Sequence, residues 1–400
     1  MLTESLDLLF NTGRGLLQEL FTKESSEVLP VYSLFSPARR KGIIEGMHSL
    51  GILFLMIVLL AAPVSGDGGD EFREVTPGRS PVLPEDLYYR GDFKIPGWYF
   101  TGHLFDTGGR EFGYELTFFT VGIQKRAYRS AFGVNTLYLS HFAVSDISNQ
   151  RYYFSERADA GAFDFAGAKD RELKVWTGKN ALEGTPEGMH LTASDPDGER
   201  SIDLFLVPKK PFVLNGDKGY SRKSEESPLL ASYYFSCTDL ETEGLLRTGG
   251  QAFRVTGKSW FDREISSRGL GKGETGWDWF ALQLDDGREI MLYLMRKKGG
   301  SIDAFSSGTV VNKDGSSRHL MRDEFAVTIL EHYRSEKTGA RYPSKWEIAI
   351  LPEKLSLVVT PMLRDQEFLA RHSTGNYYWE GAARVEGSAK GRAYVEMTGY

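Results

Sequence analysis

Acidic and aromatic side chains alternate along one stretch in the second half of the chain. In an extended strand, Trp260, Asp262 and Glu264 project to one face, and Phe261 and Ile265 project to the other. Two carboxyl groups beside an indole could form a general-acid pair, because an apolar pocket keeps a carboxylic acid protonated. Asp262 and Glu264 are therefore candidate catalytic residues, and Trp260 is a candidate ligand-lining residue. The alternative is that the apolar face forms the core while both carboxylates face solvent or basic partners.

A third candidate carboxyl group is Asp278, which lies between Trp277 and Trp279. On a strand it shares a face with Phe280 and Leu282. Burying an ionised carboxylate among such neighbours is costly unless it is paired. Asp278 is therefore either a catalytic residue or a buried hydrogen-bond acceptor, and the sequence leaves both interpretations open. Trp277 is a candidate for lining a ligand.

Two further residues are candidates for lining a ligand cavity. Tyr293 shares a strand face with Met291 and Met295, which suits either a cavity wall or ordinary core packing. His141 lies on an apolar face, where a histidine is more often a satisfied core residue than a ligand contact.

Several kinds of chemistry lack sequence support. The histidines show no metal-ligand spacing, so we predict no metal site. Cys237 is the one cysteine, which excludes an intramolecular disulfide and a cysteine-based metal cluster. No nucleophile elbow, Walker loop or dinucleotide fingerprint stands out, so we predict no cofactor and no serine-hydrolase mechanism.

Composition predicts two all-β domains and no nucleic-acid partner. The net charge is only −6, and no block of Lys and Arg forms a nucleic-acid footprint. A chain of 400 residues is long enough to form two domains. Short aromatic-rich runs such as 98–105 and 112–123 flank Gly-rich turns, and no long helical periodicity follows residue 70. This pattern favours sandwiches or barrels, with a domain boundary near residues 241–250.

The first 66 residues differ from the rest. An apolar run, Leu50–Val64, follows Arg39-Arg40-Lys41 and precedes Ser65-Gly66. This arrangement predicts a secretory signal cleaved after Gly66, and therefore a periplasmic or secreted protein. An uncleaved signal anchor, which would hold the protein near the membrane, is the alternative, although the run is short for a span of about 20 residues. Residues 67–84 are predicted to form a linker.

The motifs of residues 85–400 resemble the AttH-like and carotenoid 1,2-hydratase (hydroxyneurosporene synthase) family. The segments that carry the resemblance, in order, are GWYFTGHL (97–104), FGYELTFF (112–119), HFAVSD (141–146), ASYYFS (231–236), SWFDRE (259–264), GWDWF (276–280), LQLDDGRE (282–289), YWEG (378–381) and YVEMTGY (394–400). One departure is that Pro96-Gly97 stands where the family usually has Glu-Trp, which puts a role for that carboxylate in doubt here.

The resemblance implies two tandem lipocalin-like (calycin) antiparallel β-barrels, over residues 85–243 and 248–400. It also implies a lipophilic small molecule, such as an isoprenoid or lipid, as the partner. Two function classes follow: a hydratase that protonates a C=C bond, and a non-catalytic carrier or chaperone. An acid facing a closed apolar cavity would favour the hydratase, whereas carboxylates that face solvent or salt bridges would favour the carrier.

Overall fold

The structure is a computed structural model that describes residues 71–125 and 134–400. These described residues belong to one compact unit. The predicted signal segment and its cleavage site lie outside the described residues. In the described part of the chain, no helix is long and apolar enough to cross a membrane.

The protein is all-β, with two antiparallel sheets that form a nearly closed barrel and a half-barrel. The first sheet has the order β4-β3-β2-β1-β13-β12-β9-β8-β7-β6-β5, with β10 and β11 also paired to β12. Its strands are β1 (Ile95–Asp106), β2 (Glu111–Gly122), β3 (Thr136–Asp146), β4 (Arg151–Asp159), β5 (Ala166–Ala168), β6 (Lys174–Thr177), β7 (Asn180–Gly184), β8 (Met189–Ser194), β9 (Ser201–Pro208), β10 (Val213–Leu214), β11 (Tyr220–Arg222), β12 (Ala231–Thr248) and β13 (Gln251–Ser266).

The second sheet has the order β17-β16-β15-β14-β23-β22-β20-β19-β18, with β21 also paired to β22. Its strands are β14 (Glu274–Leu284), β15 (Glu289–Lys297), β16 (Ser307–Val311), β17 (Ser317–Leu320), β18 (Phe325–Arg334), β19 (Arg341–Ile350), β20 (Leu355–Pro361), β21 (Glu367–Ala370), β22 (Asn376–Gly387) and β23 (Gly391–Thr398). Helix is confined, in the described ranges, to the short 3₁₀ turns η2 (Glu85–Leu87), η3 (Ala162–Asp164) and η4 (Arg322–Glu324).

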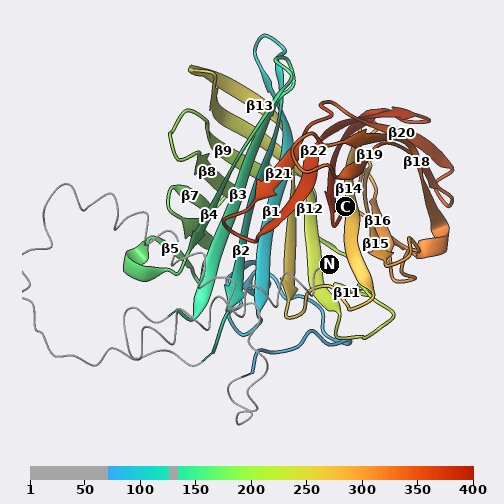
Figure 1. Cartoon of the computed structure of the whole chain (residues 1–400), viewed down its shortest axis with the longest axis horizontal. Helices are drawn as coiled ribbons and strands as arrows, with labels where there is room; N and C mark the ends of the chain where they lie inside the picture. Colours follow the sequence, from blue (N-terminus) through green and yellow to red (C-terminus); the bar gives the residue numbers. More distant parts are fainter. Residues whose placement is uncertain (1–70, 126–133) are drawn as a thin grey trace, which may run out of the picture. The chain divides into compact units, whose positions relative to one another are not determined.

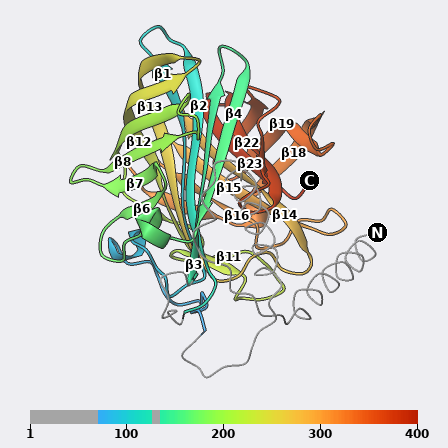
Figure 2. The same ribbon diagram turned by 60° about the vertical axis from the view of Figure 1, so that its left-hand side comes forward.

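Each sheet buries one face in its own apolar core, because side chains alternate along a strand. The core of the first sheet includes Phe100, Leu116 and Phe261. The core of the second includes Phe280 and Trp346. The opposite faces of several central strands are also buried, since the two sheets pack against each other there. Figures 1 and 2 both place β22 beside β1 to β3.

The chain passes from the first sheet to the second after Ser266, rather than between residues 243 and 248 as predicted. Gly249 and Gly250, both with positive φ, form the turn between β12 and β13. Both of these strands belong to the first sheet, where β13 pairs with β1 along its length. The glycines that suggested a boundary therefore make a hairpin inside the first sheet, because a tight turn needs the same residues as a linker.

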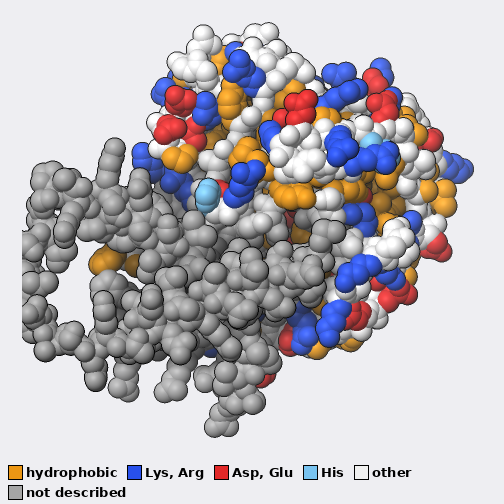
Figure 3. Space-filling view, viewed as in Figure 1, with side chains coloured by type: hydrophobic (Ala, Val, Ile, Leu, Met, Phe, Trp, Pro, Cys, Tyr) orange, Lys and Arg blue, Asp and Glu red, His pale blue; other side chains and the backbone are white. Residues whose placement is uncertain are grey.

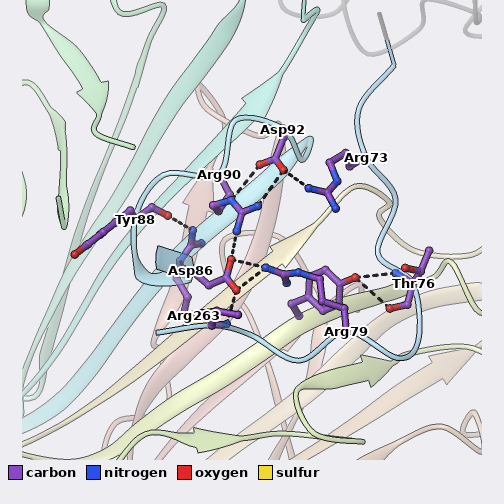
Figure 4. A network of polar contacts seen from close by, with 10 residues as sticks. Arg73, Thr76, Arg79, Asp86, Tyr88, Arg90, Asp92 and Arg263 are labelled. Carbon is purple, nitrogen blue, oxygen red and sulfur yellow. Dashed lines mark hydrogen bonds and ion pairs between the residues drawn. The ribbon is translucent and has the colours of Figure 1, made fainter. Parts of the chain in front are cut away.

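The segment predicted as a linker is packed onto the first sheet from residue 71 onward. Val75 is fully buried. The carboxylate of Asp86 is also fully buried and is paired with the guanidinium groups of Arg79 and Arg90 (Figure 4). Such a buried carboxylate needs this pairing, because an unpaired one would be strongly destabilising.

Arg263 ties this segment to β13. Its buried guanidinium donates hydrogen bonds to the backbone carbonyls of Asp86, Tyr88 and Gly97 at 2.8–3.0 Å (Figure 4). It also lies 4.0 Å from the ring centroid of Trp98, an arrangement that gives a cation–π contact. Burial lowers the pKa of Arg263 to about 9. The neighbouring residues Asp262 and Glu264 project to the other face of β13, toward the second sheet.

The surface mixes charges of both signs. Figure 3 shows Lys and Arg side chains interspersed with Asp and Glu over the described part of one face. The ion pairs of the described surface include Lys174–Glu183 and Lys209–Glu241.

Candidate active site

Four carboxyl groups meet where the two sheets face each other. Glu115 on β2 and Asp262 on β13 come from the first sheet, and Glu380 on β22 and Glu396 on β23 come from the second. The first three are 1–7% exposed, and Glu396 is partly buried. Strand pairing sets their positions. Glu380 on β22 lies directly opposite Glu396 on β23, and Glu115 on β2 lies directly opposite Thr101 on β1, the strand next to β13. Burying so many acids together favours their protonated forms.

Glu115 and Glu380 form a pair of carboxyl groups in contact. Burial raises the pKa of Glu115 to about 8, although a hydrogen bond from the Tyr378 hydroxyl at 2.9 Å works in the opposite direction. Burial and the nearby charge of Glu115 raise the pKa of Glu380 well above its usual value. Two buried carboxyls in contact cannot both ionise cheaply, so this pair holds a proton at neutral pH.

Asp262 lies in a more polar setting. Its oxygens accept hydrogen bonds from the Tyr234 hydroxyl at 2.9 Å, the Ser236 hydroxyl at 2.5 Å and the Trp260 indole at 2.9 Å. Burial raises its pKa to about 7, and the three donors limit the increase. Since every neighbouring donor points at Asp262, its hydrogen-bond pattern suits a carboxylate better than an acid.

Glu396 completes the cluster. Burial raises its pKa to about 7, while a hydrogen bond from Trp277 favours the charged form. The charges of Asp262 and Glu264 raise it further. The site thus contains two kinds of carboxyl group, one that holds its proton at neutral pH and one that titrates near it.

Aromatic and sulfur-containing side chains line the interface beside Asp262. Tyr234, Trp260, Met291, Tyr293 and Met295 form one buried cluster. The rings of Trp260 and Trp279 meet edge to face at 6.3 Å. Aromatic faces of this kind stabilise a nearby cation.

A cleft opens next to this cluster, between β1, β13, β14 and β23. Its lining includes His103, Trp260, Gln283, Arg392 and Tyr394, and its free space holds about one water molecule. The described residues therefore leave room for a reacting water here, and a larger ligand would have to part side chains.

The structure brings together most of the candidates found in the sequence. Asp262, Trp260, Trp277 and Tyr293 all face the interface between the sheets. The face containing Phe261 is indeed core, but the opposite face of β13 meets the second sheet instead of solvent. Glu264 lies at the edge of this region, where it accepts hydrogen bonds from Lys223 at 2.9 Å and Ser232 at 2.8 Å.

Asp278 lies apart from the cluster. Its carboxylate is 4% exposed and pairs with Arg296 at 3.1 Å, and the Tyr400 hydroxyl donates to it at 2.9 and 3.0 Å. Burial raises its pKa, and the charge of Arg296 opposes that increase. Of its two predicted roles, the geometry matches the buried hydrogen-bond acceptor.

His141 is buried between the two sheets, 4% exposed, and contacts Tyr378 through Nδ1 and Ser373 through Nε2, each at 2.8 Å. Its ring stacks on Phe368 at 4.7 Å. Burial lowers the pKa of His141 to about 3, so its ring is neutral at physiological pH.

Sequence reasoning missed Glu115, Glu380 and Glu396. Each of these glutamates lies inside a strand and is flanked in sequence mostly by apolar or aromatic residues. That pattern could have identified them from the sequence. A carboxyl group in the middle of such a strand is costly to bury in its ionised form on either face, so it is either paired or part of a functional site. In the described ranges, no group of three or more His, Cys, Asp or Glu side chains is arranged to hold a metal ion.

Comparison with known proteins agrees with this architecture. The model of the AttH-like family matches residues 74–400. The chain belongs to the AttH-like family. This AttH-like protein is also similar to a crystal structure assigned to AttH from Nitrosomonas europaea, with 30% identity and a TM-score of 0.75, over 82% of this chain and 100% of the other.

A more distant similarity joins the AttH-like protein to kievitone hydratase from Nectria haematococca. The identity is 13% and the TM-score 0.60, over 82% of this chain and 96% of the other, which shows a shared fold. No protein with a curated description matches the chain in sequence.

Proposed function

We propose that this protein is a hydratase that adds water to a carbon–carbon double bond of a lipophilic small molecule, or removes it. The observation that carries the proposal is the buried cluster of four carboxyl groups with raised pKa values beside an aromatic surface. Adding water to an alkene requires a strong proton donor, a site that tolerates a carbocation and a correctly placed water molecule. The carboxyl cluster is the candidate proton donor, the rings of Trp260 and Trp279 are the candidate cation site, and the cleft lined by Trp260 is the candidate water site.

The two kinds of carboxyl group divide the work. The Glu115–Glu380 pair holds a proton in a buried setting, so it is the proton donor. Asp262, held by three donors and titrating near neutral pH, orients the water and takes its proton. The rings of Trp260 and Trp279 stabilise the carbocation between these two events.

An apolar substrate suits this interface. The cluster of Tyr234, Trp260, Met291, Tyr293 and Met295 is mostly hydrophobic, and methionine adapts its shape to irregular ligands. An isoprenoid or lipid chain is therefore the expected class of substrate. The similarity in fold to a hydratase supports this proposal without identifying the molecule. We further propose that the reaction takes place outside the cytoplasm, as the apolar run before residue 66 suggests.

The test is incubation of the purified protein with acyclic carotenoids and other polyunsaturated isoprenoids, with mass spectrometry to detect a gain of one water. Glu380→Gln and Asp262→Asn should each lower turnover by about 100-fold, the usual contribution of a positioned acid or base. Asp203→Asn, which changes an exposed carboxylate paired with His190, is the control and should keep full activity. Turnover that is unchanged in both cluster variants, or tight binding of these lipids with no mass change, would contradict the proposal, and the second result would identify a carrier.

A further inference from the structure

A continuous series of hydrogen bonds leads from a half-buried carboxylate to the buried carboxyl pair. Glu156 Oε2 is 2.5 Å from the hydroxyl of Ser373. That hydroxyl is 2.8 Å from Nε2 of His141, and Nδ1 of His141 is 2.8 Å from the hydroxyl of Tyr378. The Tyr378 hydroxyl is in turn 2.9 Å from Oε1 of Glu115. All four contacts lie within hydrogen-bond range.

Both sheets contribute to this series. Glu115, His141 and Glu156 lie on the adjacent strands β2, β3 and β4, and His141 is directly opposite Glu156. Ser373 follows β21, and Tyr378 lies on β22. The two sheets must therefore pack together for the series to exist. Glu156 is its most exposed member, whereas Ser373 and His141 are each 4% exposed.

Counting hydrogens shows where the protons are. Four contacts in series need four hydrogens, but a serine hydroxyl, a tyrosine hydroxyl and a neutral imidazole supply three. Glu156 accepts hydrogen bonds from the backbone N–H groups of His372 at 3.0 Å and Ser373 at 2.8 Å, and from the Ser373 hydroxyl. With a neutral imidazole at His141, the fourth hydrogen is the proton of Glu115, since burial favours the acid form of that carboxyl group.

For a protonated Glu115 and a neutral His141, this count gives the direction of every bond. When Glu115 is protonated, its acid donates to Tyr378, whose own hydroxyl donates to Nδ1 of His141. The Nε2–H of His141 donates to Ser373, and the Ser373 hydroxyl donates to the carboxylate of Glu156. Every donor therefore points the same way, from the buried pair toward the surface. When Glu115 is ionised, the Tyr378 hydroxyl donates to it instead.

We propose that Tyr378, His141, Ser373 and Glu156 are a proton relay between solvent and the buried acid Glu115. In one transfer, the proton of Glu115 moves to the Tyr378 oxygen, and the former Tyr378 proton moves to Nδ1 of His141. The Nε2 proton of His141 moves to Ser373, and the former Ser373 proton moves to Glu156. Each intermediate group gains one bond to hydrogen and loses one. The net result is one proton moved from Glu115 to Glu156, and the reverse transfer recharges Glu115.

The relay rests on the hydrogen-bond geometry together with a protonated Glu115, and its use in catalysis rests on the proposed function. If the proton is donated by Glu115 or Glu380 and removed from water by Asp262, the donor ends each turnover without its proton. A path to solvent restores it while the interface stays closed. Tyr378, His141, Ser373 and Glu156 would then be positioning residues, which act through Glu115.

Hydrogen–deuterium exchange of the protonated carboxyl groups tests the relay without any substrate. The full-length protein is transferred from H₂O to D₂O at neutral pH, and the carboxylic-acid C=O band is followed by infrared spectroscopy. Ser373→Ala and Tyr378→Phe should each slow the shift of this band by about 100-fold, because each removes a hydroxyl that carries the proton. Ser373→Thr keeps a hydroxyl and should restore fast exchange.

Ser145→Ala is the matched control. Ser145 is buried in the same interface and donates to Gln366 at 2.6 Å, but it lies outside the relay. Its exchange should match that of the unmodified protein. Exchange at the unmodified rate in both Ser373→Ala and Tyr378→Phe would overturn the relay and leave the proposed hydratase untouched. Slowed exchange in a protein that hydrates none of the isoprenoids would support the relay and count against the hydratase.

Discussion

At the scale of single residues, burial decides what each carboxyl group can do. Asp262 and Asp278 are almost equally buried, but their partners differ. Asp278 faces the cation Arg296, so its charge is balanced. Asp262 faces neutral donors and other acids, so its charge is not balanced. The same residue type is thus a structural ion pair in one position and a candidate catalytic group in the other.

This difference predicts the effect of Asp278→Asn on stability. The substitution removes the charge that balances Arg296, which is mostly buried and would keep only backbone carbonyls of residues 398 and 399 as acceptors. We expect a loss of about 3 kcal/mol in the free energy of unfolding, as is usual when a buried ion pair loses one partner. Urea denaturation of the purified variant measures this. A loss below about 0.5 kcal/mol, the range of ordinary surface substitutions, would show that Arg296 does not need Asp278.

At the scale of elements, alternation along strands was predictable and pairing between strands was not. The sequence placed Trp260, Asp262 and Glu264 on one face of a strand, and the structure agrees. It could not show that β23 brings Glu396 opposite Trp279, because that pairing joins residues far apart in the chain. When both faces of a sheet are buried, the alternation of apolar and polar residues along a strand no longer shows that the second face is also a contact surface.

The boundary between the sheets shows the same limit. Gly249-Gly250 has the composition of a linker, but β13 continues the first sheet beyond it. The pairing of β13 with β1 decides this, and it is a contact between residues distant in sequence. The family resemblance predicted the fold class correctly. Gly269, Gly271 and Gly273, where the chain does change sheets, cannot be told apart by local composition from the glycines of the hairpin turn.

The β1–β13 pairing predicts a strong effect of one glycine substitution. A Cβ atom at Gly257 would lie 1.9 Å from the backbone oxygen of His103, so Gly257→Ala would force the two strands apart. We expect a loss of about 3 kcal/mol or more in the free energy of unfolding, the upper end for overpacked sites. Gly273→Ala is the control, since nothing lies within 4 Å of a Cβ atom there. Equal stability of the two variants in thermal unfolding would argue against the β1–β13 register.

At the scale of the whole molecule, the interface between the sheets is more than an apolar contact. Hydrogen bonds cross it from Tyr378 to Glu115, from His103 to Ala393 and from Ser145 to Gln366. Such polar contacts specify one relative placement of the two sheets better than apolar packing alone. Because the carboxyl groups of this interface come from both sheets, the packing of the sheets also depends on the protonation state of those groups.

Folding gives the interface carboxyl groups protons that the unfolded chain would not hold at neutral pH. The pKa values of Glu115, Asp262 and Glu396 are about 8, 7 and 7 in the folded protein, against usual values near 4. Acids with raised folded pKa values contribute stability that is complete below pH 4, decreases as pH rises and is lost once the pH has passed 7 to 8. His141, whose pKa is lowered, affects stability only below about pH 6.5, so it does not interfere above neutrality.

The free energy of unfolding, measured by urea denaturation from pH 6.5 to 9, is the most direct test. It should fall as pH rises, by about 1.4 kcal/mol per pH unit for each extra proton that the folded state binds. Glu380→Gln should flatten this slope, because it removes one of the acids, whereas Asp203→Asn should leave it unchanged. A free energy that stays constant or rises over this range would contradict the claim that the interface holds protonated carboxyl groups.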